Sequence, residues 1–464
     1  MQDTPKRQLT LFDSTCLIVG IIIGAGIYEV APMVAAGTSN WWGFMLIWVA
    51  GGLLSLCGAL GYAELGSAYP REGGDYVYLN RAYGPWAGFL FGWIQLVVVR
   101  PGDIVGMAFI FATYAKELYD PFSGWMVPYH LLPLEVYRQA DVAVSQLMYA
   151  ALAVIVLTAI HVIGVREGKW TQNVLTTVKA IGLLMIVAVA FFAPADRGTG
   201  TGTVNALPMS LALILVMFTF GGWNEMAYVA AEVKDSRRNI VRALVLGTSA
   251  VTVLYLLVNG AFLYALGYEG VANSSAVATD TVSTLFPKVG AGLIAGLVCI
   301  SALGATNGLI FTGARISYAL GADHRPFRLL GRWNTGTGTP VLALITQAIV
   351  ALVLIVVLGS FVNAILYTAA VVYSFYLATS LAVIVLRWKE PDVERPYRVS
   401  GFPVTTLIFS AVCGYLIYRA IIYKPQVAAA GWIILLVGLP IYWLSSRAGR
   451  AVPETPEKPS DQDR

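Results

Sequence analysis

Twelve long apolar stretches divide this sequence, and each is long enough to cross a lipid bilayer as a helix. Only 12% of the residues are charged, which is about half the share of a soluble domain. A water-soluble globular fold is therefore excluded, and we expect an all-α polytopic membrane protein. The expected spans are 13–36, 41–67, 86–116, 142–164, 170–194, 207–232, 240–266, 289–320, 340–358, 362–387, 402–421 and 428–446.

The distribution of Lys and Arg predicts how these spans are oriented. An even number of spans puts both ends of the chain on one side. Of the 30 Lys and Arg residues, 22 lie in the segments on that side or in the ends of the spans next to them. Cytoplasmic loops of membrane proteins carry such an excess. We therefore expect a multi-pass protein of the cytoplasmic membrane, with segment 1–12 and a disordered tail, 447–464, in the cytoplasm.

Residues that carry catalysis or bind metals do not form the necessary patterns. Cys16, Cys57, Cys299 and Cys413 lie in apolar runs without CxxC spacing, so neither a disulfide framework nor a zinc site is indicated. The three histidines lack partners at metal or triad spacing, and no GxxxxGK[ST] phosphate loop is present. We expect no enzyme and no cofactor, and the net charge of +4 reflects membrane orientation rather than a nucleic-acid partner.

Two spans contain closely spaced glycines that can interrupt a helix. The first has Gly20, Gly24 and Gly26 in GIIIGAGIYEVAP, and the sixth has Gly221 and Gly222 in MFTFGGWNEMAYVAAE. Such glycines let the backbone leave helical geometry, although in membrane helices they also serve close packing. Each of the two spans opens a set of five, and the sets have opposite orientations because five is odd.

This arrangement predicts two inverted repeats, 13–194 and 207–387, followed by two peripheral helices within 402–446. Unwinding a helix at mid-membrane leaves N–H groups at the start of one half-helix and carbonyls at the end of the other. Neither can stay unsatisfied in lipid. A carboxylate suits the N–H groups and an ammonium suits the carbonyls, so the sequence favours an α-amino acid as ligand.

Five segments carry a resemblance in their type, order and spacing. They are IIIGAGIYEVAP (21–32), GYAELGSAYPREGGDYVYLNRAYGPWAGFLFGWIQLVVVRP (61–101), FTFGGWNE (218–225), SALGATNGLIFTGARISYALGADHRPF (301–327) and ERPYRVSGFP (394–403). Together they resemble the amino acid–polyamine–organocation superfamily, particularly its L-type amino acid transporter branch. The resemblance implies a core of five plus five inverted helices with discontinuous first and sixth helices, and alternating access around a central amino acid site.

The resemblance also implies which residues would hold the substrate. The carboxylate would meet backbone N–H groups near Gly24, the ammonium would meet carbonyls of both interrupted spans, and Phe218 is similar to an aromatic gate. Where Ala25 stands the family usually has a polar side chain, so only the backbone would contribute there. The expected substrate-binding residues are Ile22, Gly24, Ala25, Gly26, Phe218, Gly221 and Asn224.

Three charged residues within the spans need separate interpretations. Lys179 resembles the family's fifth-helix lysine, whose ammonium replaces a sodium ion and bridges the first helix near Gly24 and the eighth near Ser301. It could exchange a proton or act as a fixed tether, while the alternative without function is snorkelling to the interface. Glu225 could neutralise a helix dipole, favour a cationic substrate or carry a proton. Arg100 looks like a family feature with a structural role.

We expect a secondary active transporter of L-amino acids, mainly neutral ones, acting as an exchanger or as a proton-linked, sodium-independent carrier. A cationic amino acid or polyamine carrier is the alternative that Glu225 suggests, and a non-transporting amino acid sensor is the alternative of another class. The outer segment Tyr119–Asp141 lacks the cysteine by which animal members of the branch join a heavy chain. The resemblance therefore implies no disulfide-linked heavy chain.

Overall fold

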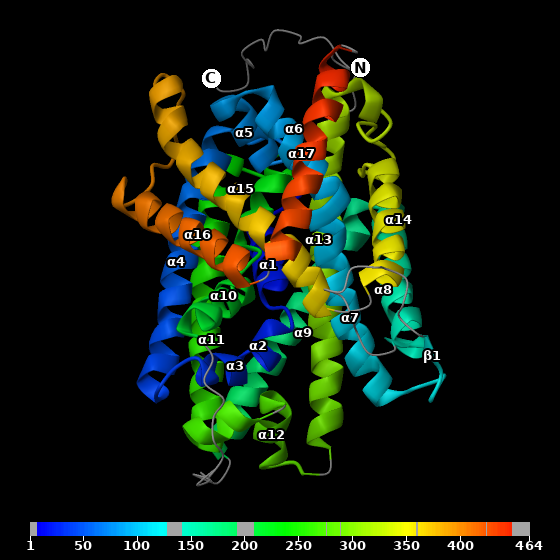
Figure 1. Cartoon of the computed structure of the whole chain (residues 1–464), viewed down its shortest axis with the longest axis vertical. Coiled ribbons are helices and arrows are strands. Elements are labelled where there is room, and N and C mark those ends of the chain that lie inside the picture. Colours follow the sequence, from blue (N-terminus) through cyan, green and yellow to red (C-terminus); the bar gives the residue numbers. More distant parts are fainter. Residues whose placement is uncertain are drawn as a thin grey trace.

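The computed structural model describes residues 7–127, 142–192, 208–274, 276–287, 289–358, 361–423 and 425–447. Long helices run along one axis of the bundle (Figure 1). Among the described residues, ten helices are long and apolar enough to cross a membrane, and Val341–Val357 and Gly431–Arg447 are shorter apolar helices. Together they account for the twelve expected spans. The expected disordered tail lies, apart from its first residue, outside the described residues.

The helices follow the chain in two sets of five spans and a final pair. The first set is α1 (Leu11–Ile22) with α2 (Gly26–Glu29) and α3 (Ala31–Ala36), α4 (Trp41–Ala68), α6 (Pro85–Ile94) with the π-helix η1 (Gln95–Val99) and α7 (Arg100–Leu118), α8 (Val144–Ile163) and α9 (Val165–Phe192). The second set is α10 (Met209–Thr219) with the 3₁₀-helix η3 (Trp223–Glu232), α11 (Ser236–Asn273), α13 (Gly290–Asp323), α14 (Val341–Leu358) and α15 (Phe361–Lys389). The final pair is α16 (Val404–Tyr423) and α17 (Pro425–Arg447).

Short elements between the spans were not predicted from the sequence. They are α5 (Asp75–Tyr83), α12 (Val277–Ser283), the 3₁₀ turn η4 (Arg325–Phe327), and an antiparallel pair of two-residue strands, β1 (Met126–Val127) and β2 (Val142–Ala143). We call the end of the bundle at which α17 finishes the terminal end, and α5 lies at this same end (Figure 1). Helices α3 and α12 lie toward the opposite end (Figure 1).

Corresponding helices of the two sets pack against each other. Helix α4 contacts α11, α7 contacts α13, and α8 contacts α14, while α1 contacts η3. Two inverted sets related by a pseudo-two-fold axis produce such pairing. Helix α16 packs mainly against α15, and α17 packs equally against α15 and α6. The expected fold class, with discontinuous first and sixth spans and two added helices, is therefore confirmed.

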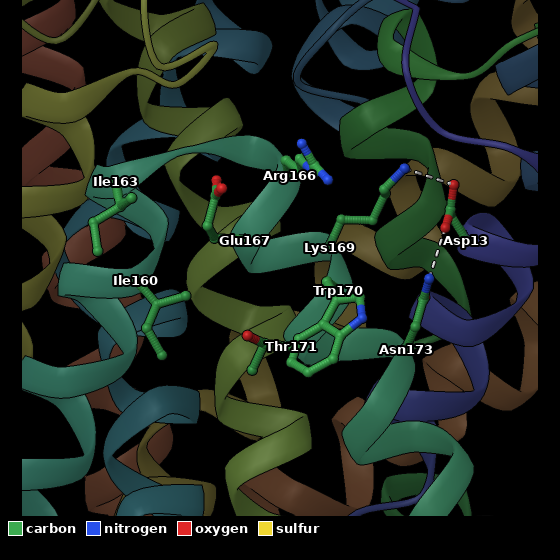
Figure 2. Close-up of a pocket in the computed structure, with 9 residues that line it drawn as sticks. All are labelled: Asp13, Ile160, Ile163, Arg166, Glu167, Lys169, Trp170, Thr171 and Asn173. Carbon is green, nitrogen blue, oxygen red and sulfur yellow. Dashed lines mark hydrogen bonds and ion pairs between the residues drawn. The ribbon is translucent and has the colours of Figure 1, made fainter.

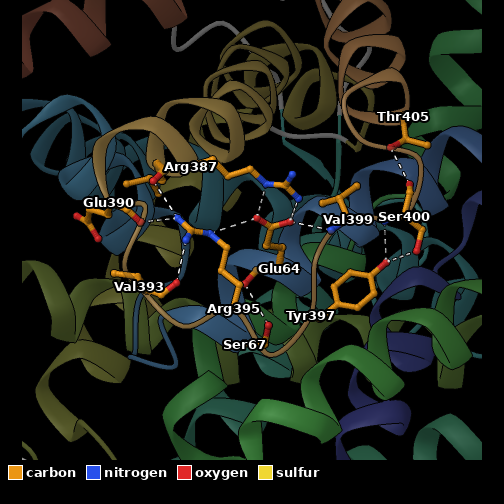
Figure 3. Close-up of polar contacts among 11 residues, drawn as sticks. Glu64, Ser67, Arg387, Glu390, Val393, Arg395, Tyr397, Val399, Ser400 and Thr405 are labelled. Atoms are coloured by element: carbon orange, nitrogen blue, oxygen red, sulfur yellow. Dashed lines mark hydrogen bonds and ion pairs between the residues drawn. The ribbon is translucent and has the colours of Figure 1, made fainter.

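A buried carboxylate fastens the segment between α15 and α16 to α4 at the terminal end. Glu64 accepts hydrogen bonds from the Arg387 guanidinium at 2.8 and 2.6 Å and from the Val399 N–H at 2.7 Å (Figure 3). Arg395 lies 3.5 Å from the same carboxylate and donates to the Leu386 carbonyl near the end of α15. These contacts give a structural role to Arg395, one of the two arginines of the ERPYRVSGFP segment.

Candidate functional site

The first break lies between α1 and α2, and side chains from distant helices satisfy the carbonyls that it frees. Lys179 is fully buried on α9, and its ammonium donates to the carbonyls of Gly20 and Ile23, the latter at 2.8 Å. It also donates to the Ser301 carbonyl on α13 at 3.2 Å. The Ser301 hydroxyl in turn donates to the carbonyls of Ile23 (3.0 Å) and Gly24 (3.2 Å). The structure thus places Lys179 between the first and eighth spans.

Two groups expected to hold substrate contact each other in this structure, and their expected role in binding substrate stays a prediction. The Gly24 N–H donates to the Ile22 carbonyl at 2.7 Å, and the Tyr255 hydroxyl donates to the same carbonyl at 2.8 Å. A carbonyl oxygen has two lone pairs, so an ammonium at Ile22 would have to replace one of these donors. Ala25 is the N-cap of α2 and Gly26 is its first residue. The first N–H groups of a helix have no hydrogen-bond partner within that helix.

The second break depends on a glycine conformation. Gly222 has φ of 109°, and a Cβ built there would lie 2.6 Å from Ile21 Cγ2 on the first span. The Gly221 N–H donates to the Phe218 carbonyl at 2.9 Å, which closes a tight turn at the end of α10. Phe218 and Gly221 are both half-buried. At Gly222, only glycine can combine the positive φ with the close approach to Ile21 without a large cost in free energy.

One hydroxyl connects the two breaks. Tyr255 on α11 lies 2.8 Å from the Ile22 carbonyl of the first break and 3.3 Å from the Thr219 carbonyl of the second. A Cβ added at Gly26 would lie 2.8 Å from Thr219 Oγ1, so Gly26 also serves close packing between the breaks. At Gly24 the nearest atom to an added Cβ would be Met107 Sδ at 3.5 Å, which is an ordinary contact.

Asn224 links the second break to the terminal end rather than pointing freely into a cavity. It is buried, its Nδ2 donates to the Tyr228 hydroxyl at 2.8 Å, and its Oδ1 accepts from Tyr376 at 3.0 Å. Tyr228 donates to Asp75, which begins α5, at 2.7 Å. The expected role of Asn224 in binding substrate stays a prediction.

Asp75 is the centre of a polar cluster that sequence reasoning missed. Besides Tyr228, the hydroxyls of Tyr62 on α4 and Thr379 on α15 donate to its carboxylate. Burial raises the pKa of Asp75 to about 6, although the three hydrogen bonds oppose the rise. The cluster joins four separate parts of the chain, namely α4, α5, η3 and α15. The acidic residue after GG in the second resembling segment was the available signal.

Glu225 and Arg100 form a buried ion pair. Arg100 Nη1 lies 2.9 Å from Glu225 Oε2, and the Thr312 hydroxyl donates to the same oxygen at 2.5 Å. The Arg100 guanidinium also lies over the Tyr228 ring, 5.4 Å from its centroid. Glu225 therefore does not offer an unpaired charge to a substrate in this conformation. Two opposite charges within the spans were the signal for this pair.

A pocket of about 710 Å³ lies away from both breaks, at the terminal ends of α8 and α9. Beside this pocket, Lys169 Nζ lies 3.2 Å from Asp13 Oδ2 and Asn173 Nδ2 lies 2.7 Å from Asp13 Oδ1. Figure 2 shows both contacts as dashed lines. The Thr176 hydroxyl donates to the Cys16 carbonyl at 3.0 Å one turn farther along α9. These contacts continue up to Lys179, so α1 and α9 are joined by polar contacts from the terminal end to the first break.

Comparisons with known proteins match almost the whole chain. The family model described as amino acid permease matches residues 9–444. The b(0,+)-type amino acid transporter 1 of Mus musculus is 30% identical over 451 residues, which cover 95% of this chain and 88% of that protein. The large neutral amino acids transporter small subunit 2 is 30% identical in Mus musculus and 29% identical in Homo sapiens, in each case over 455 residues and 95% of this chain, covering 81% and 80% of those proteins.

Proposed function

Because the chain belongs to the amino acid permease family, we propose that it is a secondary active transporter that carries L-amino acids across the cytoplasmic membrane by alternating access. The substrates are mainly neutral amino acids, as the printed names of the large neutral amino acid relatives suggest. The terminal end faces the cytoplasm, in keeping with the excess of Lys and Arg on that side. Residues 13–194 and 207–387 form the two repeats.

The single observation that carries this proposal is the meeting of two helix breaks around Tyr255. Its hydroxyl contacts carbonyls of both breaks, at 2.8 and 3.3 Å, so a small ligand could reach N–H and carbonyl groups of both at once. The carboxylate binds at the N–H groups of Ala25 and Gly26, where α2 begins. The ammonium donates hydrogen bonds to carbonyls at the end of α10, or it replaces the Tyr255 hydroxyl as a donor to the Ile22 carbonyl.

Coupling is assigned to Lys179. An ammonium that fixes carbonyls of the first and eighth spans fills the position that a sodium ion could occupy, so transport proceeds without sodium. No carboxylate contacts Lys179 among the described residues, which favours a fixed tether and exchange over proton transfer. A disulfide-linked heavy chain is not required, since Cys16, Cys57, Cys299 and Cys413 all lie within membrane helices.

Counterflow in proteoliposomes tests the function. The purified chain is reconstituted with unlabelled L-leucine inside and labelled L-leucine outside, in sodium-free buffer. Transient accumulation of the label is expected. Leucine binding without flux would instead support the amino acid sensor, and strict dependence on sodium would contradict the role of Lys179.

A further inference from the structure

The pocket of about 710 Å³ at the junction of α8 and α9 borders a surface that faces lipid. Its lining residues Ile163 and Trp170 are 66% and 67% exposed. Exposed apolar residues continue along α9 from Trp170 to Val174 and Val178, and residues spaced by four share one face of a helix. A tryptophan at the end of such a face is typical of the boundary between hydrocarbon and water. The volume lies within the range of about 300–1,000 Å³ in which proteins bind small ligands.

Four charged residues line this pocket, and two of them are not paired within the protein. Lys169 and Asp13 lie 3.2 Å apart and form an ion pair. Arg166 and Glu167 are exposed near the start of α9, and neither takes part in an ion pair among the described residues. Figure 2 shows both side chains between Ile163 on α8 and Lys169 on α9. The pocket therefore offers one cation and one anion to a ligand.

A second pocket places these two charges at the depth of lipid headgroups. It measures about 410 Å³, shares Arg166 and Glu167 with the first pocket, and extends to the segment 335–338 between α13 and α14. This segment lies outside the spans, whereas Trp170 lies one turn farther along α9 than Arg166, a rise of about 6 Å. The two charges thus lie between a polar pocket at the terminal end and the apolar surface that faces lipid.

We propose that this site binds a phospholipid whose headgroup carries a phosphate and a primary ammonium, as in phosphatidylethanolamine. The phosphate accepts hydrogen bonds from the Arg166 guanidinium, the ammonium donates to the Glu167 carboxylate, and an acyl chain lies against Ile163 and Trp170. The four charged residues of the pocket, two cations and two anions, carry no net charge, so a purely anionic lipid gains no net attraction. The site is separate from both helix breaks and does not depend on which solute is transported.

Titration with three lipids of equal acyl chains tests the proposal. The purified full chain in detergent receives phosphatidylethanolamine, phosphatidylcholine or phosphatidylglycerol, and native mass spectrometry measures the fraction with one lipid bound. Phosphatidylcholine keeps the phosphate but its ammonium has no N–H donor, and phosphatidylglycerol has no ammonium. Phosphatidylethanolamine is expected to bind about fivefold more tightly than either, which is near the upper range for an exposed ion pair. O-phosphoethanolamine, the headgroup without acyl chains, should not displace it at equal concentration.

Two variants separate the roles of the charges. Glu167→Gln should abolish the preference for phosphatidylethanolamine over phosphatidylcholine, and Glu167→Asp should retain it in part. Arg166→Gln should weaken the binding of both lipids by about fivefold.

Glu394→Gln is the matched control, because Glu394 is an exposed carboxylate at the terminal end that does not line the pocket. Its lipid preference should equal that of the wild type. Equal binding of the three lipids by the wild type, or an unchanged preference in Glu167→Gln, would overturn the proposal. Preferred binding of phosphatidylglycerol would overturn it in favour of an anionic lipid, and displacement by O-phosphoethanolamine would overturn it in favour of a soluble ligand. These outcomes do not depend on transport, which leucine counterflow tests separately.

Discussion

The two helix breaks occupy corresponding positions in the inverted repeats, yet they are stabilised in different ways. At the first break, side chains of Lys179, Ser301 and Tyr255 satisfy the freed carbonyls, and no residue between α1 and α2 has positive φ. At the second break, Gly222 adopts a φ of 109° and a 3₁₀-helix follows directly. Side chains of neighbouring helices thus maintain the first break, whereas the second break is maintained by the backbone conformation of the break itself.

This difference shows where each break is vulnerable. The first should respond to changes in residues far away in the sequence and tolerate a small side chain within it. The second should respond to any side chain at its glycine. The following predictions test this contrast, beginning with the largest expected effect.

Lys179→Ala should abolish transport. It removes a cation that hydrogen-bonds to three carbonyls, and a charged hydrogen bond contributes about 1.5–3 kcal/mol. We expect sodium-free leucine counterflow to fall about 100-fold or more. Lys169→Ala is the matched control on the same helix, because Lys169 pairs with Asp13 beyond the breaks. Full activity of Lys179→Ala in sodium-free buffer would contradict the tether.

Gly222→Ala should destabilise the protein and lower counterflow about tenfold, because the left-handed conformation costs an L-residue about 1–2 kcal/mol and the new methyl group would approach Ile21. Gly24→Ala at the first break should leave the melting temperature unchanged, since its methyl group meets Met107 at an ordinary distance. It should still weaken transport by intruding on the substrate. Equal melting temperatures for both variants would remove the contrast between the breaks.

Phe218→Ala should have the smallest effect and should separate binding from flux. We expect Phe218, as the aromatic gate that the resemblance implies, to close over bound substrate while backbone groups make the hydrogen bonds. We expect the transport rate to fall about threefold and leucine affinity to change less. Equal losses in both measurements would place Phe218 within the recognition site.

The sequence predicted the parts of this account that depend on long patterns. Twelve apolar runs, two glycine-rich interruptions and a lysine within the fifth span have strong local signals, and the structure places Lys179 at the first break. The Arg100–Glu225 pair and the Asp75 cluster could not be predicted in the same way. Their members lie far apart in the sequence, and only the packing of α5, α7, α15 and η3 brings them together.

Packing also changed the meaning of individual glycines. Gly24 and Gly26 belong to the same motif, yet Gly26 packs against Thr219 while Gly24 has room for a methyl group. The sequence contains no information that separates these two roles.

Competition by truncated substrates tests most directly whether both breaks bind one amino acid. Leucine counterflow by the reconstituted wild type is measured with 3-methylbutylamine, which lacks the carboxylate, and with 4-methylpentanoate, which lacks the amine. If the carboxylate binds at α2 and the ammonium at the end of α10, each analogue should compete about 100-fold or more weakly than L-leucine, because each leaves one break unsatisfied. Competition by either analogue as strong as that of L-leucine would contradict a site shared by the two breaks.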